Sequence, residues 1–163
     1  MSFLLVQLLP REVEGVEERL RLALERADTA RGALDLLTDL LARYGQTGLH
    51  GAKLVYHNSY LIAHPEGAWV LETAGEFWAA KRVQGHAAIS NGLTIGGDFD
   101  ESAPGMIDAA RKLGLLRQGE DFDFARCFAD PFYRIFTGCR PRRSRRVRPP
   151  PPRAGAGESA SRR

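Results

Sequence analysis

The sequence predicts an α+β fold in which two amphipathic helices precede an antiparallel β-meander. Three observations lead to this fold class. Apolar residues recur at helical spacing before residue 45, and β-branched and aromatic residues concentrate after Gly51. Short turns of a few residues join consecutive strand-like segments. Helices and strands that are segregated along the chain, rather than alternating, exclude a doubly wound parallel sheet.

The two helices are expected at residues 13–27 and 30–44. Asp28-Thr29 supplies N-cap residues for the second helix, and Gly45 follows that helix where a left-handed residue is favoured. The apolar positions of the first helix are Val13, Val16, Leu20, Ala23, Leu24 and Ala27. Those of the second are Ala33, Leu34, Leu37, Leu41 and Tyr44. The short link between the two helices predicts an αα-hairpin.

Four strands are expected in the meander, at residues 55–63, 68–73, 77–83 and 87–90. Pro65-Glu66-Gly67 and Ala74-Gly75-Glu76 supply the first two turns, and Gly85 separates the last two strands. A further helix is expected over residues 103–116. An aromatic cluster that folds back on the core is expected after it, formed by Phe122, Phe124, Phe128, Phe132, Tyr133 and Phe136.

Charge divides the chain into two parts. Residues 140–163 hold nine arginines and one acid, a net charge of +8, so the remaining residues carry 14 basic and 19 acidic side chains, a net −5. We therefore expect a folded domain over residues 1–139 and a disordered Arg/Pro-rich tail over 140–163. The tail contains no aromatic residue, so it should bind nucleic acid only non-specifically, through phosphates. A solvated tail without function is the simpler interpretation.

The apolar runs are too short for a membrane span, and the apolar start lacks the basic region and cleavage site of a signal peptide. Cys127 and Cys139 are too few for a disulfide framework or a four-cysteine zinc site. These observations predict a cytoplasmic protein without membrane contact.

Few residues suggest a catalytic or metal site on composition alone. Cys127 could pair with a histidine as a nucleophile, the candidates being His50, His57, His64 and His86, but a buried small apolar role is the favoured interpretation. His57 and His64 need not share a strand face, so no zinc site is expected. Asp98, Asp100 and Glu101 are interpreted as a solvated turn rather than a calcium loop. The glycines at residues 92–97 match no nucleotide-binding motif, so no cofactor is expected.

Asn91 leaves two alternatives open. An Asn beside Gly92 at a strand end is typical of a turn. Its amide could instead project into a cleft and stabilise an oxyanion.

Several motifs occur in an order that resembles the secernin and bacterial dipeptidase family. They span residues 22–30, 44–48, 57–63, 68–75, 78–80 and 89–95, with further similarity at 122–124 and 138–140. The resemblance covers roughly residues 16–140. It implies an N-terminal-nucleophile hydrolase fold, an αββα sandwich, in which an N-terminal cysteine attacks an amide and its own α-amino group acts as the base. It also implies that Asn91 belongs to the oxyanion hole.

The chain departs from the family pattern at its start. Met1-Ser2-Phe3 replaces the segment that bears the nucleophilic cysteine, and the first cysteine is Cys127. We therefore expect a truncated member with a partial sandwich. By descent it is a dipeptidase or amide hydrolase for a peptide or small amide substrate, inactive as it stands. The alternative is a non-enzymatic interaction protein that uses its exposed sheet or basic tail.

A partial sandwich predicts an uncovered apolar sheet face that promotes homo-oligomerisation. The residues expected to line or flank it are Leu61, Ile62, Trp69, Leu71 and Trp78.

Overall fold

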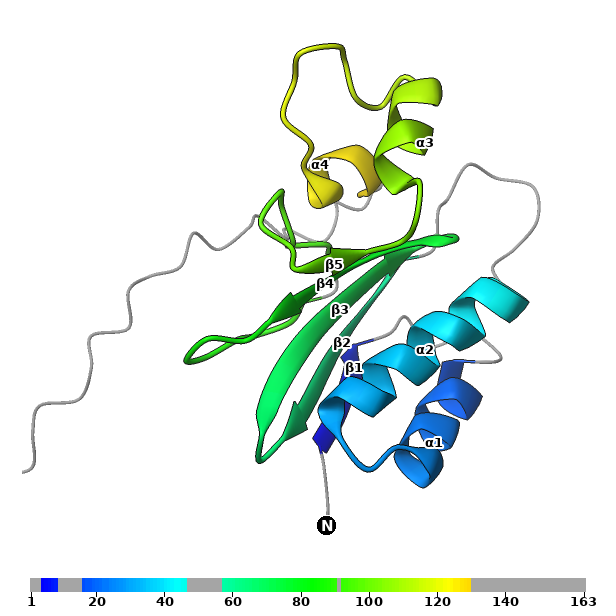
Figure 1. Cartoon of the computed structure of the whole chain (residues 1–163), viewed down its shortest axis with the longest axis vertical. Coiled ribbons are helices and arrows are strands. Elements are labelled where there is room, and N and C mark those ends of the chain that lie inside the picture. The colour runs from blue at the N-terminus through cyan, green and yellow to red at the C-terminus, as the bar shows by residue number, and fades with distance from the viewer. Residues whose placement is uncertain (1–3, 9–15, 47–56, 91, 130–163) are drawn as a thin grey trace, which may run out of the picture.

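The computed structural model describes residues 4–8, 16–46, 57–90 and 92–129. The elements are β1 (Leu4–Leu8), α1 (Val16–Arg26), α2 (Ala30–Tyr44), β2 (His57–His64), β3 (Gly67–Ala74), β4 (Phe77–Arg82), β5 (Glu101–Ser102), α3 (Met106–Lys112) and α4 (Phe124–Phe128). The strands form one antiparallel sheet in the order β1-β2-β3-β4-β5. Helices α1 and α2 lie together on one side of this sheet, and α3 and α4 lie near one end of it (Figure 1). The predicted α+β fold class is confirmed.

The αα-hairpin forms where the sequence predicts it. Thr29 caps α2, because its Oγ1 accepts a hydrogen bond of 3.0 Å from the Gly32 N–H. Gly45 ends the helix with φ of +64°, and its carbonyl accepts a 2.7 Å hydrogen bond from Arg19 of α1. The predicted inner face extends only to Leu41. Tyr44 is exposed, because it ends the helix beyond the last residue that packs on the sheet.

The face of the sheet beneath these two helices is covered, and we call it the helix face. Tyr60, Ile62, Leu71 and Ala80 point to it and pack against Ala23, Ala33, Leu34 and Leu37. The prediction that Ile62 and Leu71 would line an uncovered face is wrong. Both are at most 1% exposed, because α1 and α2 cover the alternate residues of β2 and β3 to which they belong.

The opposite face, called the second face, carries Ser59, Leu61, Val70, Glu72 and Ala79 by strand alternation. A second apolar core forms there from Val70, Ala74, Ala79, Leu93, Ile95, Met106, Ala110, Phe124, Cys127 and Phe128. The predicted aromatic cluster is confirmed in part. Phe128 stacks on Phe77 and Phe124 with ring centroids 5.0 and 5.3 Å apart. Phe132, Tyr133 and Phe136 lie outside the described residues.

Three features of the sheet and its surroundings differ from the prediction. Residues 87–90 do not form a strand; their place beside β4 is taken by β5, with Asp100 donating its N–H to Ala80 and Ala103 donating to Trp78, both at 2.9 Å. Strand β1 was not predicted, and it pairs with β2 across a long sequence separation. Helix α3 is shorter than predicted, because Gly105 precedes it and Leu113 already caps it.

No helix within residues 16–46, 57–90 and 92–129 has the length and apolar character needed to cross a membrane. The basic tail, the second cysteine Cys139 and the boundary at residue 140 lie outside the described part of the chain.

Candidate functional site

Glu72 is the one fully buried carboxylate among the described residues. It lies within strand β3, on the second face, and none of its surface is exposed. Its Cα partner on β2 is Ser59, and its partner on β4 is Ala79, so small residues flank it on both sides. A charge in this position is costly unless donors surround it.

The loop that crosses the second face supplies those donors. The Thr94 N–H donates to the two carboxylate oxygens at 2.9 and 2.7 Å, the Thr94 Oγ1 hydroxyl donates at 2.7 Å, and the Ile95 N–H donates at 2.9 Å. Burial raises the pKa of Glu72, while these hydrogen bonds and the nearby His57 oppose that shift. Glu72 thus holds this loop against the sheet.

We call residues 92–97 the anchored segment, because it is also fixed from its other side. The carbonyl oxygens of Ile95 and Gly96 accept hydrogen bonds from Ala125 and Phe124 at the start of α4. Gly97 passes so close to Phe122 that an added Cβ would lie 2.5 Å from its carbonyl oxygen. Only glycine fits this approach. The segment is therefore held between β3 and α4.

The predicted oxyanion residue, Asn91, immediately precedes the anchored segment and lies outside the described residues. Its two neighbours are described. The Ser90 hydroxyl donates to the Gly92 carbonyl at 3.1 Å and accepts from the Gly92 N–H at 3.3 Å. The chain on both sides of Asn91 is thus joined by one side chain.

A surface groove of about 690 Å³ lies beside the anchored segment on the second face. Its lining comes from both sides of Asn91, with His86, Ala87 and Ala88 before it and Thr94 and Ile95 after it. Lys81 and Asp98, which also line it, form an ion pair that lowers the pKa of Asp98. The groove therefore offers both apolar and charged contacts to a ligand.

The acidic residues after Gly97 have structural partners. Asp98 pairs with Lys81, the Asp100 carboxylate accepts the Arg82 N–H at 2.7 Å, and Glu101 pairs with Arg31. Within the described ranges, no three His, Cys, Asp or Glu side chains come together as metal ligands. The acids pin the loop to the sheet and to α2.

Cys127 has the buried, apolar surroundings that the favoured interpretation requires. It is 6% exposed in the second apolar core, and its sulfur lies 3.7 Å from the Leu115 carbonyl oxygen. His57 and His64 fall on opposite faces of β2, as their odd spacing requires. Ser59 is buried and its hydroxyl has no hydrogen-bond partner, so no base activates it. Neither the Cys127 thiol nor the Ser59 hydroxyl is thus placed as a nucleophile.

Residues 10–143 match the family model of peptidase family C69. The chain belongs to peptidase family C69. The match spans α1 to α4 and includes Glu72, the anchored segment and Asn91. It confirms the resemblance at the level of a peptidase family and supports a dipeptidase-like hydrolase.

Glu72 was not predicted from the sequence as a functional residue, although it lies in residues 68–75, one of the motifs that carry the family resemblance. One signal was available, because a carboxylate stands in a strand of mostly apolar residues between Leu71 and Thr73. A charge at such a place calls for a partner.

Proposed function

We propose that this C69 chain provides the sheet, the groove and the oxyanion residue of an amide hydrolase that cleaves dipeptides or small acyl-amides. The observation that carries the proposal is the buried Glu72 carboxylate, which holds the segment directly after Asn91 at the edge of the groove. A residue that stabilises a transition state must be held in place before the reaction begins. The Glu72 anchor supports such preorganisation of Asn91.

In the proposed mechanism, the side-chain amide of Asn91 donates a hydrogen bond to the substrate oxygen as negative charge develops on it. The nucleophile would be an N-terminal cysteine with its α-amino group as base, as in the secernin-like relatives. The thiolate would displace the amine to form a thioester, and water would then release the acid. The groove would position the acyl group.

Cys127 does not fit the part of that nucleophile. It lies within the chain, in an apolar core, on the short helix α4. We therefore propose that this chain by itself hydrolyses no dipeptide. The test is an assay of the purified chain against a dipeptide panel, with Cys127→Ala and Cys139→Ala as paired controls. Turnover by the parent chain would contradict the proposal, and turnover that survives both substitutions would in addition show that the nucleophile is neither cysteine.

If the DNA upstream of the gene encodes, in frame, a segment that begins with a cysteine, the role of Asn91 can be tested. The protein for this test is the chain with that segment added at its N-terminus. In that protein Asn91→Ala should lower kcat by about 10²–10³-fold, the usual effect of removing one oxyanion donor. Arg111→Gln, on α3 and outside the lining of the groove, is the control, and we expect it to keep most of the activity. An unchanged kcat in Asn91→Ala would remove Asn91 from the mechanism.

For the Arg/Pro-rich tail, we propose weak, sequence-independent binding of nucleic acid. The support is the contrast between +8 on residues 140–163 and −5 on the rest. Neutralising about eight phosphates gives a log–log salt slope near −7, so a few-fold rise in salt should abolish binding. Binding that persists after deletion of residues 140–163 would place the site on the folded domain instead.

A further inference from the structure

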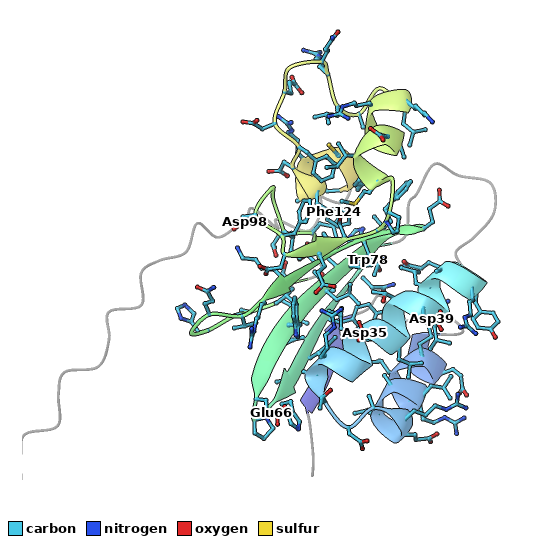
Figure 2. All side chains as sticks on the ribbon, in the orientation of Figure 1. Asp35, Asp39, Glu66, Trp78, Asp98 and Phe124 are labelled. Atoms are coloured by element: carbon cyan, nitrogen blue, oxygen red, sulfur yellow. The ribbon has the colours of Figure 1, made fainter. Side chains whose placement is uncertain are left out.

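A second pocket lies on the helix face, on the opposite side of the same end of the sheet from the groove, and Arg82 lines both. It has a volume of about 340 Å³ and is lined by the start of α2, the β2–β3 hairpin and the end of β4. Its residues are Thr29, Ala30, Arg31, His64, Glu66, Gly67, Trp69 and Arg82. Figure 2 shows Glu66 at the tip of this hairpin, far from Phe124 and the second apolar core. We call it the hairpin pocket.

His64 gives the first indication of what the hairpin pocket binds. Its side chain is only 5% exposed, and its Nδ1 accepts the Glu66 N–H at 3.3 Å. An accepting Nδ1 in a neutral imidazole places the proton on Nε2. The Nε2 atom is buried and has no hydrogen-bond partner. A buried donor without an acceptor is costly, so this imidazole, which belongs to the lining of the pocket, has an unmet need for an acceptor.

The two arginines of the pocket differ in whether their charge is already paired with carboxylates. Arg31 binds Asp35 and Glu101 and lies over the Trp69 ring, 5.7 Å from its centroid, so its charge is balanced. Arg82 is the cross-strand partner of Trp69, and no carboxylate of the described residues lies within ion-pair distance of its guanidinium. That guanidinium lies beside Gly67, where an added Cβ would be 3.7 Å from Nη2. Arg82 is thus the cation available to a ligand.

Helix α2 adds a third source of positive potential. It is 15 residues long, it begins at the pocket, and its first turn contains no acidic residue. The first N–H groups of a helix lack intrahelical partners and favour an anion. Thr29 already satisfies the Gly32 and Ala33 N–H groups, which leaves those of Ala30 and Arg31. Among the described residues, the carboxylate that lines the pocket is that of Glu66, whose Oε2 lies 3.9 Å from the His64 Nδ1. Its side chain is 80% exposed at the hairpin tip and so can turn away.

We infer that the hairpin pocket binds a small oxyanion, a phosphate group or a terminal carboxylate, between Arg82, the His64 Nε2–H and the start of α2. The ligand supplies the acceptor that these three donors lack. Because the pocket lies on the helix face and the Glu72 anchor lies on the second face, this inference stands whether or not the chain takes part in peptide hydrolysis.

The test is a titration with inorganic phosphate at constant ionic strength, followed by the NMR signals of the Trp69 indole and the arginine side chains. We expect saturable shifts at Trp69 and Arg82. Arg82→Gln should weaken binding about tenfold, the usual effect of losing a charge-assisted hydrogen bond. His64→Phe, which keeps a ring but removes the donor, should also weaken it, and Glu66→Gln should strengthen it a few-fold.

A matched control and a second probe complete the experiment. Arg111→Gln removes another exposed arginine, on α3 and outside the pocket, and should leave binding unchanged. N-acetylglycine against N-acetylglycinamide tests the terminal carboxylate as the source of the oxyanion. Binding of phosphate or of N-acetylglycine supports the inference and distinguishes the two sources. Absence of saturable shifts with both probes, or equal affinity in the parent and Arg82→Gln, would overturn it.

Discussion

On the helix face, Ile62 and Leu71 are buried by apolar contact with α1 and α2. On the second face, beside Leu71 in the same strand, Glu72 is buried just as completely and is held by four hydrogen bonds from the anchored segment. Apolar contact tolerates small rotations and shifts, whereas hydrogen bonds to a carboxylate are directional. Apolar packing therefore stabilises the sheet on both faces, and on the second face the Glu72 hydrogen bonds in addition give one loop a defined position.

Buried polar groups of the helix face sharpen the contrast. Asn58 and Thr73 are Cα partners on adjacent strands, and the Asn58 Nδ2 and Thr73 Oγ1 atoms are buried without a hydrogen-bond partner. Glu72, one residue away, has its donors supplied by a segment more than 20 residues further along the chain. The Glu72 carboxylate is thus hydrogen-bonded by a loop of the candidate site, whereas Asn58 and Thr73 beside it keep unpartnered polar atoms.

The largest effect is expected from breaking the helix face. Leu71→Ala should lower the free energy of unfolding by about 2–5 kcal/mol, because it leaves a cavity in a fully buried core. Leu61→Ala, on the second face and only partly buried, is the matched control and should cost clearly less. Urea unfolding at pH 7 measures both. Equal losses for the two variants would contradict the assignment of faces.

A smaller loss of stability, about 1–3 kcal/mol, is expected for Glu72→Gln, because the amide nitrogen cannot accept the hydrogen bonds of Thr94 and Ile95. Hydrogen exchange should show the Ile95 amide becoming less protected. Gln84→Glu, an isosteric change at an exposed position of the same face, is the control. Unchanged protection of Ile95 would refute the anchor.

The same variant carries a pH signature. Burial raises the pKa of Glu72 above its ordinary value of 4.5. The folded state therefore binds this proton more tightly than the unfolded state. The contribution of Glu72 to stability is complete below pH 4.5 and declines as the pH rises through the folded-state pKa. Glu72→Gln should remove that decline, and a difference between parent and variant that grows with pH would contradict the sign.

The smallest effect is expected for Asp98→Asn. Lys81 lowers the pKa of Asp98 below 3.8, so its contribution is present above pH 3.8 and is lost as the pH falls through the folded-state value. The side chain is 69% exposed, so the loss at pH 7 should stay below about 1 kcal/mol and shrink in high salt. Thermal unfolding at two salt concentrations measures it. A salt-independent loss would show that Asp98 acts by another means.

The parts of the fold that follow from local chemistry were predictable. The hairpins joining β2, β3 and β4 depend on turn residues a few positions apart, and the helix hairpin depends on Thr29 and Gly45. Strand β1 was not predictable in this way, because its partner β2 lies some 50 residues away and no turn connects them. Strand β5 is two residues long and exists only because β4 offers an edge to it.

Of the candidate site, the sequence predicted only Asn91, through the family resemblance of the residues around it. It predicted neither the role of Glu72 nor the groove. The sequence shows that Glu72 is charged, but its partners are mainly backbone N–H groups of Thr94 and Ile95, and every residue except proline has such a group. The hairpin pocket was missed for a similar reason. Residues 29–31, 64–69 and 82 meet only when the helix layer docks on the sheet.

The position of Cys127 has a practical consequence. Its thiol sits in the second apolar core with a residue exposure of 6%, so a thiol reagent can reach it only when that core opens. In a Cys139→Ala background, the labelling rate of Cys127 would then report the opening of the region packed on the second face without any added probe. Because α4 also binds the anchored segment, the same labelling rate would measure how often the loop that follows Asn91 is released.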